Sequence, residues 1–107
     1  MGLEQLNPIV LCTREVIRNV KPKTLNFILS RAFRLMNSKV DFCVFDPEAK
    51  LLSLEDDGRT ARVPCKAVSE KIYAILDDFG SPEVLSENLG EKVQTQYVLT
   101  ILFASEY

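Results

Sequence analysis

Residues 39–64 constrain the fold more than any other stretch, because they alternate apolar and polar residues between two turn signals. Apolar side chains recur at every second position over residues 40–44, which is the period of a β-strand. Asp46-Pro47 is typical of a turn, and the run from Asp56 to Gly58 provides a glycine for a hairpin. We therefore predict an antiparallel meander of three strands over about residues 40–63.

Two helices are predicted before the meander. Over residues 24–37, apolar side chains stand three, four, seven, eight and eleven positions after Leu25, and this stripe indicates an amphipathic helix. Residues 8–19 begin near the helix-start pair Asn7-Pro8, but their many β-branched residues also suit a pair of strands. No Gly, Asn, Asp or Pro stands where such a strand pair would turn, so we favour a helix here as well.

Three elements are predicted after the meander. Apolar residues at helical spacing favour a helix over residues 66–79. Ser81-Pro82 is typical of a helix start and Gly90 of a helix end, which predicts a short helix over residues 82–89. Residues 93–104 alternate apolar side chains and become apolar on both faces near their end. This pattern predicts a closing strand in the centre of the sheet.

Length and composition indicate one small α+β domain over residues 1–107. With 47% apolar and 26% charged residues, the chain resembles an ordinary globular protein that buries a single core. No apolar run approaches the roughly 20 residues that cross a bilayer, and the N-terminus lacks a signal-peptide pattern. Cys12, Cys43 and Cys65 show no Cys-x-x-Cys spacing. We expect a soluble intracellular protein, cytoplasmic or nuclear, with reduced thiols and no membrane partner.

The sequence carries no catalytic or metal-binding signature. It contains no histidine, so the commonest general base and the Ser-His-Asp arrangement are absent. Cys65 precedes the predicted helix of residues 66–79 and has Lys66 and Arg62 nearby, an arrangement that lowers a thiol pKa. A cysteine enzyme is therefore one hypothesis, and a buried, unreactive thiol is the other. We expect no enzyme, no cofactor and no metal.

Charge is distributed unequally along the chain. Residues 1–40 carry seven basic and two acidic residues, whereas residues 41–107 carry six basic and thirteen acidic residues. If each sign gathers on one surface, the two fields would steer and select a partner. The predicted basic partner-binding face consists of Arg14, Arg18, Lys21, Lys23, Arg31 and Arg34. The predicted acidic partner-binding face consists of Glu55, Asp56, Asp57, Asp77 and Asp78.

Two short runs resemble a known family. Residues 18–25 (RNVKPKTL) with the helix they begin, and residues 54–60 (LEDDGRT), look like the CIDE-N interaction domain over about a third of the chain. The resemblance implies a homotypic interaction domain with opposed charged faces. It assigns no individual site residue.

These observations favour a non-enzymatic protein-interaction or assembly module, such as an adaptor, that acts as an oligomer or as a subunit of a complex. Its expected partner is another protein or a second copy. The alternative is a nucleic-acid-binding accessory protein that uses the basic face, because phosphate contacts need a cationic surface. Against that alternative, the basic residues are not interleaved with aromatic ones and the net charge is −2.

Overall fold

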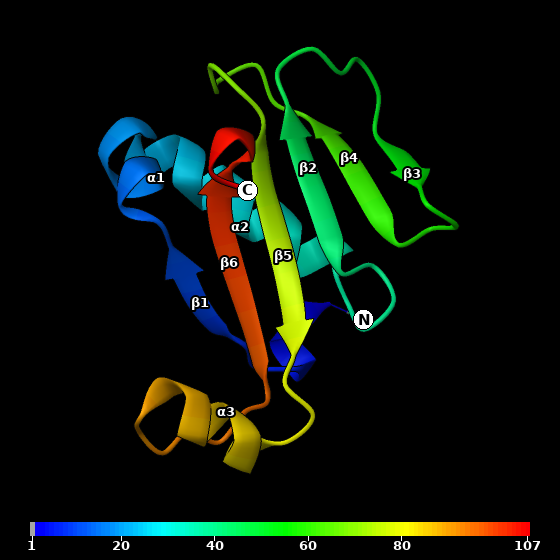
Figure 1. The fold of residues 1–107 in the computed structure, drawn as a ribbon. Helices are drawn as coiled ribbons and strands as arrows, with labels where there is room; N and C mark the ends of the chain where they lie inside the picture. The colour runs from blue at the N-terminus through cyan, green and yellow to red at the C-terminus, as the bar shows by residue number, and fades with distance from the viewer. Residues whose placement is uncertain (1) are drawn as a thin grey trace.

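The computed structural model describes residues 2–107 as three α-helices and one six-stranded mixed sheet, which confirms the α+β class (Figure 1). The strand order is β1-β6-β5-β2-β4-β3. β1 runs parallel to β6 and β2 parallel to β4, while the other neighbouring pairs are antiparallel. The elements are η1 (Leu3–Gln5), β1 (Ile9–Cys12), α1 (Arg14–Asn19), α2 (Pro22–Leu35), β2 (Phe42–Asp46), β3 (Ser53–Glu55), β4 (Thr60–Pro64), β5 (Ile72–Asp78), α3 (Pro82–Leu89), β6 (Tyr97–Phe103) and η2 (Ala104–Glu106).

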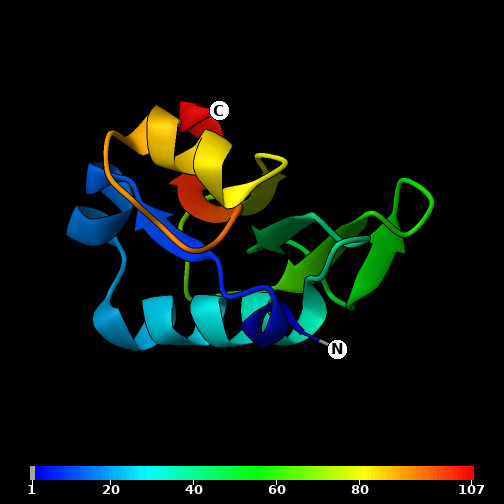
Figure 2. The same ribbon diagram turned by 90° about the horizontal axis from the view of Figure 1, so that it is seen from below.

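The core lies between α2 and one face of the sheet. α2 confirms the helix predicted for residues 24–37 and begins two residues earlier, at Pro22, whose ring fits the first helical turn. Its apolar stripe buries Ile28 and Ala32 completely, and Met36 directly after the helix is also buried. Figure 2 shows α2 lying along one side of the sheet. The sheet contributes the buried side chains Cys43, Phe45, Ala61, Val63, Ile72, Ala74, Leu76, Leu99, Ile101 and Phe103.

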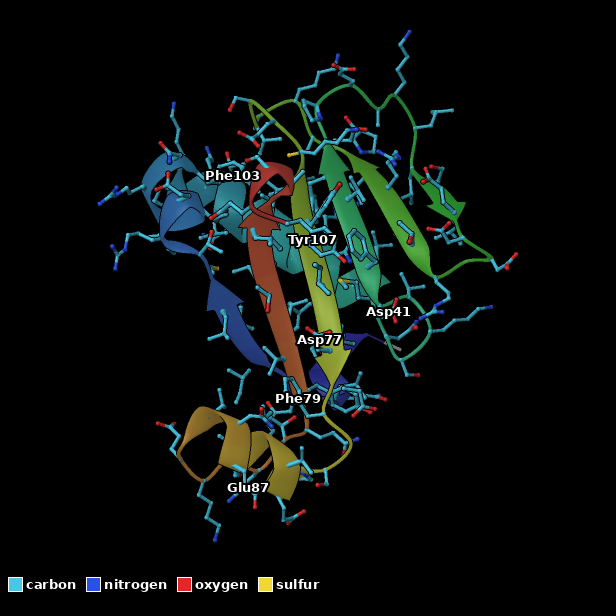
Figure 3. The ribbon with its side chains drawn as sticks, viewed as in Figure 1. Asp41, Asp77, Phe79, Glu87, Phe103 and Tyr107 are labelled. Carbon is cyan, nitrogen blue, oxygen red and sulfur yellow. The ribbon has the colours of Figure 1, made fainter. Side chains whose placement is uncertain are left out.

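The opposite face of the sheet carries an aromatic cluster. The side chain of Phe42 lies 4.9 Å from that of Tyr73 and 6.0 Å from that of Tyr107, measured between ring centroids. Successive strand residues alternate between faces, so Phe42 points away from the side that buries Cys43. In Figure 3, Tyr107 lies in front of β5 and β2, on the side of the sheet away from α2.

The helix predicted for residues 8–19 is wrong in its first half. Residues 9–12 form β1, which pairs in parallel with β6 from the end of the chain. The helix begins only at Arg14, where the Thr13 hydroxyl accepts a hydrogen bond from the Val16 N–H at 3.3 Å. The strand alternative was rejected for lack of a local turn, but β1 needs no turn because its partner is distant in sequence.

The predicted meander is also wrong in its pairing. Three strands form, but β2 pairs in parallel with β4, and β3 lies outside β4 at the edge of the sheet. This order places Phe45 beside Val63 on the buried face. The hairpin between β3 and β4 forms as predicted, with positive φ at three successive residues: Asp56, Asp57 and Gly58. Pro64 is the last residue of β4, as its missing N–H donor predicts.

The helix predicted for residues 66–79 is wrong. The second half of this segment is β5, a central strand between β2 and β6. Ile72 and Leu76 stand four positions apart, and that spacing satisfies both a helix and a strand. The buried Ala74 between them completes the strand period, and hydrogen bonding to neighbours on both sides overrides the helical pattern.

The last two elements agree with their predictions. α3 spans residues 82–89; the Ser81 hydroxyl accepts from the Val84 N–H, and Gly90 ends the helix at φ 74°. The closing strand is β6, shorter than the predicted 93–104, and it lies between β1 and β5. Its central position agrees with the apolar character of both its faces.

Candidate functional site

Five of the six residues of the predicted basic face lie on two consecutive helices, and the sixth, Lys21, lies between them. Arg14 and Arg18 are on α1, Lys21 immediately precedes α2, and the rest are on α2. Only Val20 and Lys21 separate the two helices, and we call these six residues together the cationic surface. Of these six, only Arg18 makes an ion pair within the described chain, an exposed contact of 3.8 Å with Glu15 that contributes little stability.

One stripe of the cationic surface runs along α2. Lys23, Phe27, Arg31 and Arg34 follow each other at intervals of four, four and three residues, which places them on one side of a helix. The Arg31 guanidinium carbon lies 5.3 Å from the centroid of the Phe27 ring, a cation–π contact. Phe27 remains 37% exposed, so the stripe presents both charge and an aromatic edge to a partner.

The five predicted acidic residues do not form one face. Glu55, Asp56 and Asp57 lie at the β3–β4 turn, whereas Asp77 and Asp78 end β5. Strands β2 and β4 stand between β5 and β3, so the two groups are separated across the sheet. Figure 3 shows Asp77 at the end of β5 that leads toward α3. The five acidic residues therefore lie on two parts of the sheet, both at the end where Asp41 is hydrogen-bonded to the backbone of Arg59 and of Leu76.

Glu55 is occupied by an internal ion pair. The Arg62 Nε donates to Glu55 Oε2 at 2.7 Å, and the Arg62 Nη1 donates to Asp46 Oδ2 at 2.7 Å. Asp46 is 6% exposed, and its other carboxylate oxygen accepts from the Glu48 N–H at 2.8 Å. That backbone hydrogen bond and Arg62 lower the pKa of Asp46, and Arg62 lowers the pKa of Glu55. The network ties β2, β3 and β4 together and leaves Glu55 unsuited to a partner.

The backbone conformation of the β3–β4 turn determines where Asp56 and Asp57 lie. The Gly58 N–H donates to the Glu55 carbonyl, and the Thr60 hydroxyl donates to Asp56 Oδ2 at 3.0 Å. Asp tolerates the left-handed region better than most residues, which suits Asp56 and Asp57 at φ 54° and 56°. Both side chains are exposed, so the turn projects negative charge from the edge of the sheet.

The surroundings of Cys65 differ from those of a reactive thiol, which is partly exposed and has a lowered pKa. The helix expected to begin after it is absent, and the side chain is 5% exposed. Burial raises the pKa of the Cys65 thiol, although hydrogen bonds from the Ala67 and Val68 N–H groups act in the opposite direction. Burial also raises the pKa of Cys43 to about 12 and that of Cys12 above its usual value.

A groove beside Cys65 was not predicted from the sequence. It lies between α2 and the loop after β4, encloses about 340 Å³, and is lined by Lys23, Thr24, Phe27, Pro64, Cys65, Lys66 and Ala67. We call it the α2 groove. Its floor is apolar, and exposed lysines from two different elements stand on its rim. No sequence pattern indicates this groove, because Lys23 and Lys66 are far apart in the chain and come together only in the folded protein.

An exposed apolar edge was also missed. Leu52 and Leu54 stand two positions apart in the second strand of the predicted meander, a spacing that places them on one face. In the structure Leu51, Leu52 and Leu54 are 79%, 52% and 63% exposed. They belong to β3 and the residues before it, at the open edge of the sheet. We call residues 51–57 the leucine edge. Three leucines in four positions without an apolar partner could have indicated it.

Within residues 2–107, no group of three or more Cys, Asp or Glu side chains is arranged to hold a metal ion. None of the helices described there is long and apolar enough to pass through a bilayer. Comparison of the chain with protein-family models, curated proteins and solved structures finds no match. The surfaces themselves must therefore carry any functional argument.

Proposed function

We propose that this chain is a non-enzymatic protein-interaction module whose cationic surface binds an acidic surface of a protein partner, within an oligomer or a larger complex. The observation that carries the proposal is the α2 stripe of Lys23, Phe27, Arg31 and Arg34. Its cations are not neutralised by ion pairs within the described chain, and an exposed aromatic ring lies among them. Arg and aromatic residues are enriched where binding energy concentrates in protein interfaces.

A nucleic-acid partner is the second candidate, because the same six cations could contact phosphates. The stripe offers a single aromatic ring, Phe27, and that ring is engaged by Arg31 and by an edge contact with Phe45 at 6.5 Å. Base stacking needs rings with free faces. The arrangement therefore supports a protein partner better.

The test is charge reversal of Arg31→Glu with Arg34→Glu, compared with the neutral pair Arg31→Gln and Arg34→Gln. We expect the wild type to associate with itself or with an acidic partner from its native cell. The Gln pair should associate more weakly and the Glu pair most weakly. Sedimentation velocity measures self-association, and affinity capture measures partner binding. About 0.5 M salt, where the screening length is roughly 4 Å, should weaken the wild-type contact.

Association that is equal in all three proteins and unchanged by salt would contradict the proposal. A mobility-shift assay at about 50 and about 200 mM salt decides the alternative, because phosphate binding falls steeply over that range. Selective labelling of Cys65 by a thiol reagent at neutral pH would instead revive the enzyme hypothesis.

A further inference from the structure

We infer that the α2 groove of one copy of this chain receives the leucine edge of a second copy. The inference rests on the proposed function and names the partner: the apolar and acidic segment of residues 51–57. The receptor is the groove between α2 and the loop after β4. Each copy carries both halves of the contact, so two copies can associate without any other protein.

The groove offers apolar contact with positive charge at its rim. Phe27, Pro64 and Ala67 provide apolar lining, while Lys23 and Lys66 contribute ammonium groups from the two opposing elements. Neither lysine forms an ion pair or a side-chain hydrogen bond in the part of the chain that the structure describes. A ligand that fits this groove has a branched apolar side chain with a carboxylate close by.

The leucine edge has that composition. Leu51, Leu52 and Leu54 lie mostly in solvent, and the exposed carboxylates of Asp56 and Asp57 follow within three residues of Leu54. Contiguous exposed apolar side chains mark interaction surfaces, because a solitary soluble chain rarely leaves them uncovered. Two lysines facing two aspartates would orient the approach, and burial of leucine side chains would provide most of the affinity.

The edge does not fill the groove of its own copy, because Leu51, Leu52 and Leu54 remain largely exposed. Residues Ser53–Glu55 are hydrogen-bonded to β4 in antiparallel register, from Ser53 opposite Arg62 to Glu55 opposite Thr60. The Arg62 ion pair with Glu55 further fixes β3 in place. The β3 part of the edge, Ser53–Glu55, is therefore held in place before docking, which lowers the entropy cost of docking into another molecule.

A phosphate alone would pair with the lysines and leave the apolar lining of the groove at Phe27, Pro64 and Ala67 uncovered. The acidic leucine segment is the match in both polarity and charge.

The test uses two full-length variants, each with one half of the contact altered. The groove variant carries Lys23→Glu and Lys66→Glu. The edge variant carries Leu52→Thr and Leu54→Thr, which keep strand propensity. In sedimentation velocity we expect the wild type to associate with rising concentration and each variant alone to bind itself at least about tenfold more weakly. An equimolar mixture should form a 1:1 heterodimer, because it still contains one intact groove and one intact edge.

Matched controls separate the site from general effects. Lys71→Glu with Lys92→Glu makes the same change in net charge outside both the groove and residues 51–57, and Ile17→Thr removes an exposed apolar side chain elsewhere. Both controls should associate as strongly as the wild type. Equal melting temperatures across the set would show that every variant is folded.

Three results would overturn the inference. They are a wild type that stays monomeric at about 1 mM, a groove variant that associates normally, and two non-associating variants whose mixture remains monomeric. In the first two cases the proposed function is still decided separately, by the response of partner capture or association to the Arg31 and Arg34 substitutions. A heterodimer that forms in the mixture, but not in either variant by itself, would establish the groove and the edge as the two sides of one contact.

Discussion

The Arg62 side chain links three strands of the sheet, because it bonds Glu55 on β3 and Asp46 on β2 from its own place on β4. It joins the buried carboxylate of Asp46 to Glu55, so the charges sit in a hydrogen-bonded network. We predict that Arg62→Met, which keeps the apolar stem, lowers the free energy of unfolding by about 2 kcal/mol, because Asp46 loses a charged partner. Denaturant unfolding measures the change.

The control for Arg62 is Arg59→Met. Arg59 pairs with Asp41 at 3.1 Å, but its side chain is largely exposed. Exposed pairs contribute at most about 1 kcal/mol, so this variant should lose clearly less stability than Arg62→Met. Equal losses of stability in the two variants would contradict the view that burial strengthens the contribution of the Arg62–Asp46 pair.

The same network predicts a dependence of stability on pH. The pKa values of Asp46 and Glu55 are lowered in the folded protein from ordinary values of 3.8 and 4.5. Their contribution is therefore complete above about pH 4.5, declines as the pH falls past those ordinary values, and is lost below the lowered folded pKa values. The stability difference between wild type and Arg62→Met should shrink as the pH falls through this window. A difference that stays constant from pH 7 to acid would contradict the assignment.

At the scale of elements, helices with local signals are predictable and strands with distant partners are not. α3 has a capping serine, a first-turn proline and a glycine stop, and the sequence places it correctly. β1 and β5 have no comparable start and stop residues. β1 pairs only with β6, near the other end of the chain, and β5 pairs with β2 and β6, which are far apart in sequence. In β5, the apolar residues Ile72 and Leu76 stand four positions apart, a spacing that a helix satisfies equally well.

The cap of α3 gives the element-scale prediction. Ser81→Ala removes the acceptor for the Val84 N–H and should cost about 1 kcal/mol of stability, seen as a lower denaturant midpoint. Ser30→Ala is the matched control: Ser30 lies within α2 and is exposed, so alanine there should be neutral or slightly stabilising. Loss of stability in the control as large as in Ser81→Ala would contradict the capping role.

At the scale of the whole molecule, chain order and strand order together determine where the predicted charged residues lie. The cations gather because α1 and α2 are consecutive, so their neighbourhood follows from chain order. The acidic residues separate because the strand order places β2 and β4 between β5 and β3, and pairing order is not written locally. The α2 groove likewise depends on the loop after β4 meeting α2, which no spacing in the sequence indicates.

The most direct test of the claim that this chain associates through its cationic surface is a series of amide NMR spectra recorded from about 20 µM to about 1 mM, a range that covers micromolar to millimolar affinities. We predict progressive shifts along the α2 stripe from Lys23 to Arg34 and in residues 51–57, with smaller shifts at about 0.5 M salt. Shifts confined to the aromatic face around Phe42, Tyr73 and Tyr107 would contradict it.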